Sequence, residues 1–307
     1  MSVIKVSNLT KDYGSGRGIF DVSFEVNQGE VFGFLGPNGA GKSTTIRHLM
    51  GFSKPDKGNC EIFDKSSFKR YYEILGNVGY IPGEISLPAG LTGWQFLSMM
   101  QDLQKCHNDE RLKYLLDLFK LDPSGETKRM SLGVKRKLAI VAANMNDPKV
   151  LILDEPTSGL DPVMQDVFID FIKEEKERGK SILLSSHIFT EVDATCDRIA
   201  IIKDGKLVSN FIADDLKHAT LKTYIITFKY KKDIDVFLSK KTKVYNVIDV
   251  NNKAKSITLT IEDNQMNKLL PILAKYDIKD FSHSKETLED YFMKYYKEDK
   301  NFEGGLR

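Results

Sequence analysis

Apolar residues in this chain fall into short runs and alternations that are separated by glycine, proline and polar turns. Alternating apolar positions from 20 to 26, and compact apolar runs at 31–35, 150–153 and 182–184, predict β-strands. Fully apolar runs of this length are typical of strands that are buried on both faces of a parallel sheet. Apolar residues at helical spacing follow several of them. The pattern therefore predicts an α/β fold for the first two thirds of the chain.

Weaker patterns predict the remaining elements of this part. We expect a strand at 3–6, followed by a polar loop that carries Tyr13, and we expect Thr92 to cap a helix. The region that follows, from residue 94 to 119, is helical in pattern. Further strands are predicted at 59–63, 77–82 and 181–186, and further helices after 131 and over 163–178.

Residues 214–307 have a different pattern. Alternating apolar residues at 224–230 and 257–261 predict strands, and two helical segments lie between or after them. The order β-α-β-β-α-β with a last helix predicts a small α+β domain of the ferredoxin-like type. We therefore expect two domains, 1–213 and 214–307. The last helix carries an apolar face that we assign to core packing, made of Leu288, Tyr291, Phe292, Tyr295 and Tyr296.

A glycine-rich segment follows the strand at 31–35 and fits G-x-x-x-x-G-K-[ST], the phosphate-binding loop. Glycines let backbone N–H groups turn inward around a phosphate, and the following helix start adds a partial positive charge. We expect Lys42 to reach the β- and γ-phosphates, Ser43 to bind Mg²⁺ and Thr44 to donate to a phosphate oxygen. The segment is Gly36, Pro37, Asn38, Gly39, Ala40, Gly41, Lys42, Ser43 and Thr44.

Two other predicted strands end in side chains that suit nucleotide hydrolysis. Asp154 and Glu155 end the run that begins at residue 150, and His187 follows the strand at 181–186. Ligands bind at the carboxyl edge of open α/β sheets, so these groups are expected to meet there. We expect Asp154 to hold Mg²⁺, Glu155 to polarise the attacking water and His187 to bond the γ-phosphate.

Two more features suit a nucleotide. Ser131 is a good helix N-cap and Gly133 permits close approach, so this helix start also suits an anion. Because the phosphate loop already fills that need, the second start makes sense if it serves the nucleotide of another subunit. Tyr13 precedes the phosphate loop and can stack on a base, the alternative being a surface tyrosine beside the glycine-rich run 14–18.

The composition of the chain limits the kinds of binding partner and the cellular setting that we expect. A net charge of +2 over 307 residues creates no strong field toward nucleic acid, so we expect no nucleic-acid partner. Three scattered cysteines, Cys60, Cys106 and Cys196, do not make a disulfide framework, which fits a reducing cytoplasm. No basic-then-apolar leader opens the chain, and no apolar run approaches the ~18 residues of a membrane span.

Together these residues resemble the nucleotide-binding subunit of an ABC transporter, over about residues 1–213. The resemblance implies a P-loop NTPase of ABC type, with a RecA-like core, an antiparallel β subdomain and a helical signature subdomain. The matching positions are Tyr13 for adenine stacking, Gly36–Thr44 for Walker A, Ser131–Val134 for the signature motif, Val150–Glu155 for Walker B, Ser158–Asp161 for the D-loop and His187 for the switch histidine.

The resemblance implies an ATPase that uses ATP and Mg²⁺ and couples hydrolysis to transmembrane transport. Two copies, expected to form a homodimer, would hold two ATP molecules between them. Each ATP would lie between the phosphate loop of one copy and Ser131 and Gly133 of the other, and the D-loop match adds Asp161 to the nucleotide-binding set. The implied partner is a separate transmembrane permease, which would place the chain on the cytoplasmic face of the cell membrane.

The chain departs from the family pattern at two places. The signature reads S-L-G-V where the family usually has S-G-G-Q, so that Leu132 and Val134 replace a glycine and a glutamine. Gly83 stands where a glutamine is expected, and we expect the neighbouring Glu84 to substitute for it. Similar replacements are familiar from ATPases that serve ABC-2-type permeases, most of which are exporters. Export is therefore the expected direction.

Other functions fit less well. A GTPase would need an N/T-K-x-D motif at a strand end, and the near match at 53–56 has the composition of a turn. An ABC ATPase that acts on DNA would need a long heptad insertion between the phosphate loop and Ser131, where none is present. The alternative that stays open is a soluble ABC-type ATPase that works without a permease.

Overall fold

The computed structural model describes residues 1–214, 221–239, 242, 244–262, 265–284 and 288–296. The chain divides into two compact units, Met1–Ala213 and Asp214–Arg307. Each unit has its own sheets and its own hydrophobic core.

A six-stranded sheet with the order β10-β9-β3-β8-β7-β6 organises the first unit. The strands from β9 to β6 run parallel, and β10 pairs antiparallel with β9. Every residue of β3, β7 and β8 is buried, which explains their apolar sequences and confirms these three predicted strands. The strands are β3 (Val31–Leu35), β6 (Val78–Ile81), β7 (Val150–Asp154), β8 (Ser181–Ser186), β9 (Arg198–Lys203) and β10 (Lys206–Ile212).

A second, antiparallel sheet has the order β2-β1-β4-β5 and shares a core with the first, where the Phe24 and Phe32 rings stack with centroids 5.1 Å apart. The polar loop predicted after residue 6 is wrong, because β1 continues through Tyr13. Register shifts along β1 break the alternation of apolar residues that would have indicated a strand. The strands are β1 (Ser2–Gly14), β2 (Arg17–Asn27), β4 (Lys57–Ile62) and β5 (Lys65–Ser66).

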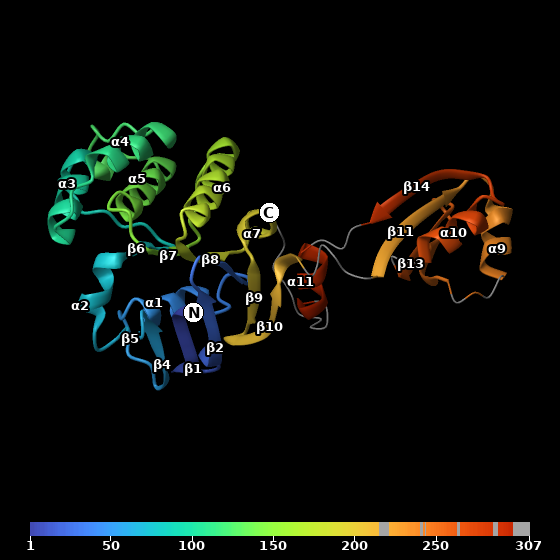
Figure 1. Ribbon diagram of the computed structural model, residues 1–307, viewed down its shortest axis with the longest axis horizontal. Helices are drawn as coiled ribbons and strands as arrows, with labels where there is room; N and C mark the ends of the chain where they lie inside the picture. Colours follow the sequence, from blue (N-terminus) through green and yellow to red (C-terminus); the bar gives the residue numbers. More distant parts are fainter. Residues whose placement is uncertain (215–220, 240–241, 243, 263–264, 285–287, 297–307) are drawn as a thin grey trace. The chain divides into compact units, whose positions relative to one another are not determined.

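Helices surround the larger sheet. In Figure 1, α3, α4 and α5 gather at the end of the first unit beyond β6 and β7, and the antiparallel sheet forms the opposite end. The helices are α1 (Lys42–Leu49), α2 (Tyr71–Ile74), α3 (Gly93–Gln104), α4 (Asp109–Leu118), α5 (Leu132–Asn144), α6 (Pro162–Glu177) and α7 (Phe189–Thr195), with 3-10 turns η1 (Leu75–Asn77) and η2 (Thr127–Arg129).

The region from 94 to 119 is helical as predicted, but it is divided into two separate helices, α3 and α4. Lys105 ends α3 in the left-handed conformation, with φ at 51°. Asn108 then starts α4, because its side-chain oxygen accepts a hydrogen bond from the Arg111 N–H at 3.0 Å. The predicted cap at Thr92 is confirmed, and Gln95 completes a capping box with it.

The second unit is a four-stranded antiparallel sheet, ordered β12-β13-β11-β14, with helices that cover its apolar residues. Tyr224, Ile226 and Phe228 are buried as their alternation predicts, whereas Tyr230 lies beyond the strand and is exposed. The side chains of Tyr295 and Tyr296 lie outside the described residues. The elements are β11 (Leu221–Phe228), α9 (Lys231–Ser239), β12 (Asn246–Asn251), β13 (Ser256–Glu262), α10 (Met266–Leu273), β14 (Ile278–Ser284) and α11 (Leu288–Tyr296).

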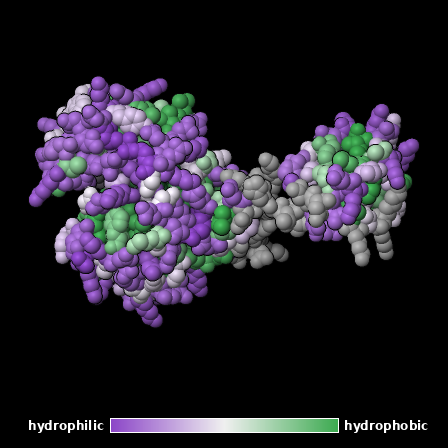
Figure 2. Space-filling model, viewed as in Figure 1, coloured by the Kyte–Doolittle hydropathy of each residue, from purple (hydrophilic) through white to green (hydrophobic). Residues whose placement is uncertain are grey.

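The visible face of the first unit is mostly hydrophilic (Figure 2). Among the described residues, none of the helices combines the length and the apolar character that crossing a membrane requires.

Candidate functional site

The phosphate loop predicted from the sequence runs from the end of β3 into the first turn of α1. Gly39 and Gly41 have φ angles of 84° and 112°, a region that residues with a Cβ rarely adopt. Helix α1 begins without a side-chain cap on its N-terminus. The backbone N–H groups of this turn can therefore bind an anion, as they do at other phosphate-binding helix starts.

Lys42 is almost fully buried and its ammonium group lies inside the loop. Its Nζ donates to the carbonyl oxygens of Gly36 at 2.5 Å and Pro37 at 3.2 Å. The same Nζ lies 3.0 Å from Oε1 of Glu155. The loop thus folds around a positive charge that points toward the end of β7.

Asp154 and Ser43 border a common space. Asp154 is buried at the end of β7, where the Ser185 hydroxyl donates to its Oδ1. A Cβ on Gly83 would lie 3.0 Å from Oδ2 of Asp154 and 3.8 Å from the Ser43 hydroxyl oxygen, so both oxygens face the same side of this glycine. A carboxylate and a hydroxyl beside a phosphate-binding loop are the oxygen ligands that Mg²⁺ prefers. The residues present therefore fit this ion.

Glu155 and His187 are brought together as the sequence predicts. Nδ1 of His187 lies 2.6 Å from Oε2 of Glu155, and half of the His187 side chain is exposed. Glu155 leaves β7 with a φ of 49°, and its N–H donates to the Ser185 carbonyl oxygen at 3.1 Å. This sharp turn directs the Glu155 carboxylate back to Lys42 on one side and to His187 on the other.

Ser131, Gly133 and Asp161 lie on a different group of elements. The Ser131 hydroxyl accepts a hydrogen bond from the Val134 N–H at 3.3 Å and so caps α5, as predicted. Asp161 caps α6 by accepting from the Met164 N–H at 3.1 Å. Within the described residues, no hydrogen bond or ion pair joins these three residues to the phosphate loop. A role of these residues toward the nucleotide of another subunit stays a prediction.

Tyr13 and Glu84 are both exposed. Tyr13 lies near the end of β1, with the Lys11 Nζ 5.9 Å from its ring centroid. Lys11 is held there by Asp56, whose Oδ1 accepts from it at 2.8 Å. Glu84 follows β6 and makes no hydrogen bond or ion pair within the described part of the chain. A nucleotide role for either residue stays a prediction.

Two buried charged residues near the site were missed from the sequence. Arg136 of α5 is 2% exposed, and burial lowers the pKa of its guanidinium while Asp154 and Glu155 oppose that change. Glu191 of α7 is also buried, which raises its pKa to about 7. Its Oε2 accepts from the Ser186 hydroxyl at 2.5 Å, directly before His187. The sequence does not show that Arg136 is buried, because it lies between Lys135 and Lys137 in a basic run. It also gives no sign that Glu191 is buried.

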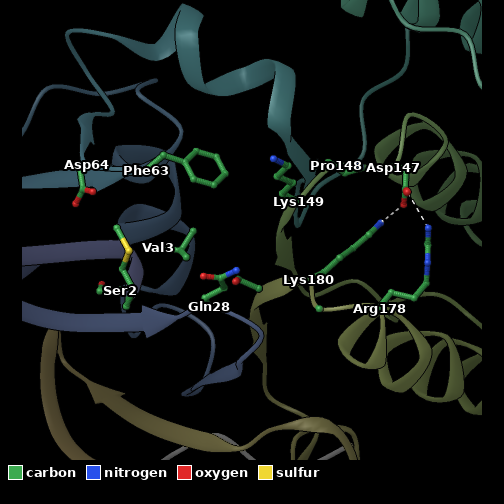
Figure 3. Close-up of a pocket in the computed structure, with 13 residues that line it drawn as sticks. Ser2, Val3, Gln28, Phe63, Asp64, Asp147, Pro148, Lys149, Arg178 and Lys180 are labelled. Atoms are coloured by element: carbon green, nitrogen blue, oxygen red, sulfur yellow. Dashed lines mark hydrogen bonds and ion pairs between the residues drawn. The ribbon is translucent and has the colours of Figure 1, made fainter.

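A pocket of about 680 Å³ lies at the edge of the larger sheet opposite to the one that carries the phosphate loop (Figure 3). Its wall includes Gln28, Lys149 and Lys180, which precede β3, β7 and β8, so it opens where these parallel strands begin. In Figure 3, Lys180 and Arg178 both point to Asp147, with which they form ion pairs at 2.7 Å. None of the predicted site residues lines this pocket.

Comparisons with known proteins agree on a family. The sequence model of the ABC transporter family matches residues 19–158. The chain is 32% identical over 297 residues to the ABC transporter ATP-binding protein YhcH of Bacillus subtilis, which covers 95% of each chain. It is 33% identical over 299 residues to the bacitracin transport ATP-binding protein BcrA of Bacillus licheniformis, over 95% of this chain and 97% of that protein. The solved structure of an ATP-binding subunit of an ABC transporter matches with a TM-score of 0.66 and 31% identity, over 71% of this chain and 92% of that chain.

Proposed function

The chain belongs to the ABC transporter family as an ATP-binding subunit, and we propose that it dimerises on MgATP to drive export through a separate membrane permease. It is an ABC transporter ATPase. It has the ABC-type P-loop α/β fold with an additional β-rich region toward its C-terminal end.

Three side chains carry the proposed chemistry. Lys42 binds the β- and γ-phosphates together with the backbone N–H groups of Gly36–Thr44, Glu155 accepts a hydrogen bond from the attacking water, and His187 holds the γ-phosphate. Support comes from their spacing, because Glu155 lies 3.0 Å from the Lys42 ammonium and 2.6 Å from the His187 ring nitrogen. A phosphate that displaces the ammonium from Glu155 would leave this carboxylate beside the reacting atoms.

Mg²⁺ would neutralise phosphate charge and fix the orientation of the oxygens that it binds. Ser43 and Asp154 are the side chains that would hold it, and their shared side of Gly83 supports this assignment. Ser185 in turn donates to Asp154 and orients its carboxylate.

The dimer is proposed from the position of the second anion site. Ser131 and Gly133 start α5, and Asp161 starts α6, on the part of the unit that carries the helices α3 to α6. A two-fold dimer would place the α5 start of one copy over the phosphate loop of the other, because a symmetric interface is self-complementary. Each ATP would then join both copies, and hydrolysis would release them.

Export is proposed from the relatives and from the altered signature. BcrA is named a bacitracin transport protein, and the chain is aligned with it along almost its whole length. Leu132 and Gly83 are the replacements that we associate with ATPases of ABC-2-type permeases. The subunit would bind the permease at the cytoplasmic face of the membrane, and the permease would select the substrate.

The unit Asp214–Arg307 is proposed to be a separate ferredoxin-like domain. Support comes from its β-α-β-β-α-β order and from its antiparallel strand order β12-β13-β11-β14. The three-part division of the first unit into a RecA-like core, an antiparallel β subdomain and a helical signature subdomain is proposed on the same footing, from its two sheets and the group α3 to α5.

The contact of Glu155 with both Lys42 and His187 is the observation that carries the proposal. We would compare ATP turnover of the purified full-length chain with that of Glu155→Gln, and measure molar mass by light scattering with MgATP. We expect turnover to fall at least about a hundredfold, because the base is lost, while the variant accumulates as an ATP-bound dimer. Glu110→Gln, on the exposed side of α4, is the matched control and should retain both behaviours. Undiminished turnover by Glu155→Gln would remove this residue from the mechanism.

A further inference from the structure

We propose that Arg136 is a positioning residue for ATP hydrolysis, which locks the loop after β6 and the loop after β7 to helix α5. This proposal rests on the proposed function, since it concerns the same site. Arg136 is 2% exposed, and its guanidinium donates to three backbone carbonyl oxygens. Nη1 donates to Pro82 at 2.9 Å, Nη2 to Gly83 at 2.8 Å and Nε to Ser158 at 2.9 Å.

The three acceptors belong to two loops that are far apart in the sequence. Pro82 and Gly83 follow β6, and Ser158 lies between β7 and α6, so one side chain ties both strand ends to α5. Only a planar fork with several fixed donors can reach three carbonyls in this arrangement, whereas a lysine ammonium is a single point at the end of a flexible stem. The arrangement therefore depends on arginine and not merely on positive charge.

The loop after β6 depends on the hydrogen bonds from Arg136 because it has a glycine, Gly83, near its start. Gly83 has no side chain that could contact the proposed Mg²⁺ ligands Asp154 and Ser43. Its backbone nevertheless lies beside them, because a Cβ on Gly83 would be 3.0 Å from Asp154 Oδ2. Arg136 fixes the carbonyl of this glycine and faces the negative charges of Asp154 and Glu155. Arg136 therefore links helix α5 to the backbone at 82–83, which lies beside the proposed Mg²⁺ ligand Asp154.

A second contact on the same helix face strengthens the connection. Leu132 and Arg136 are four residues apart, and such pairs lie on one side of a helix. A Cβ on Gly159 would lie 2.8 Å from Leu132 Cγ, so the Leu132 side chain covers this glycine directly beside Ser158. Movement of the α5 start would therefore be passed to both the loop after β7 and the loop after β6.

The test compares Arg136→Lys with the wild-type chain and with Lys137→Gln. Lys137 is half-buried on the same helix and makes no hydrogen bond or ion pair within the described residues, so its replacement controls for a side-chain change on α5 that leaves the two loops untouched. We expect Arg136→Lys to lower kcat at least about tenfold, because misplaced catalytic groups are costly. The KM for ATP and the thermal midpoint should stay within about threefold and about 4 °C of wild type, as expected for a folded protein with intact binding. Lys137→Gln should behave as wild type in all three.

Amide hydrogen exchange supplies a readout that does not depend on turnover. In the nucleotide-free full-length chain, we expect Arg136→Lys to speed exchange in peptides covering 82–86 and 156–161 and to leave β7 and β8 unchanged. Unchanged kcat in an active protein, or unchanged exchange in both loops, would overturn the proposal. A general loss of protection that reaches β7 and β8 would also overturn it, since Arg136 would then be only a packing residue. If the wild-type chain itself fails to hydrolyse ATP, the proposed function fails, and the exchange result still judges the role of Arg136.

Discussion

Replacing Glu155 by glutamine is expected to tighten ATP binding in addition to stopping turnover. In the structure, the Lys42 ammonium that should receive the phosphates is occupied by the Glu155 carboxylate at 3.0 Å and by two loop carbonyls. ATP must displace that carboxylate before its phosphates can reach Lys42. Glutamine keeps the shape of the side chain but removes the charge, so that ATP no longer competes with an ion pair.

The magnitude follows from the geometry. Two unit charges 3.0 Å apart attract by about 5.5 kcal/mol at the effective dielectric of about 20 that suits protein sites. Most of this is offset, because Glu155 is partly solvated again once ATP releases it. If about a quarter of the attraction remains as a net penalty, the variant gains about 1.4 kcal/mol, which corresponds to roughly tenfold tighter binding.

The assay is isothermal titration of ATP in the presence of a chelator, so that neither hydrolysis nor metal-dependent dimerisation contributes. Light scattering would confirm that both proteins are monomers under these conditions. Glu110→Gln is the control, because it removes an exposed carboxylate of α4. An affinity for ATP that is equal to or weaker than that of the wild type would refute the idea that the Lys42–Glu155 pair opposes nucleotide binding.

Three further predictions concern stability and base recognition. Burial raises the pKa of Glu191 from 4.5 to about 7, although the Ser186 and Thr157 hydroxyls oppose the shift. The fold must then lose stability as pH rises from about 4.5 to about 7, by up to about 3 kcal/mol, and urea unfolding of Glu191→Gln should lack this slope. Glu175 is fully buried and pairs with Arg111 at 2.5 Å as well as with Lys180 and Arg178, so Glu175→Ala should lower the free energy of unfolding by about 3–5 kcal/mol without changing ATP affinity. Tyr13→Ala should weaken ATP binding by about 1–3 kcal/mol if the ring stacks on adenine, whereas Tyr13→Phe should bind ATP normally in the same titration.

The candidate site could be predicted because its residues follow fully buried parallel strands. Such strands appear in the sequence as apolar runs, and their carboxyl ends meet at one edge of the sheet. The placement of Glu155 beside His187 needed no more than this rule, and the structure confirms it at 2.6 Å. The caps at Thr92 and Ser131 were predictable because each depends on a few neighbouring residues.

Features that depend on distant contacts could not be predicted. Lys135, Arg136 and Lys137 are three consecutive basic residues, and nothing in the sequence shows which of them is buried, because that depends on how α5 packs against two distant loops. The break between α3 and α4 depends on the left-handed conformation of Lys105. A lysine in the sequence does not indicate that conformation, which glycine and asparagine adopt more readily. The length of β1 was hidden because its register shifts disturb the alternation of apolar residues.

The central claim is that this ATPase works on a separate membrane permease, and purification from native membranes tests it most directly. The tagged full-length chain would be extracted in a mild detergent, and the proteins that co-purify would be identified by mass spectrometry. The account predicts a stoichiometric partner with several membrane spans, retained by the wild type and by Glu155→Gln. Recovery of the chain without any membrane protein under several detergents would contradict the claim and favour an ABC-type ATPase that acts without a permease.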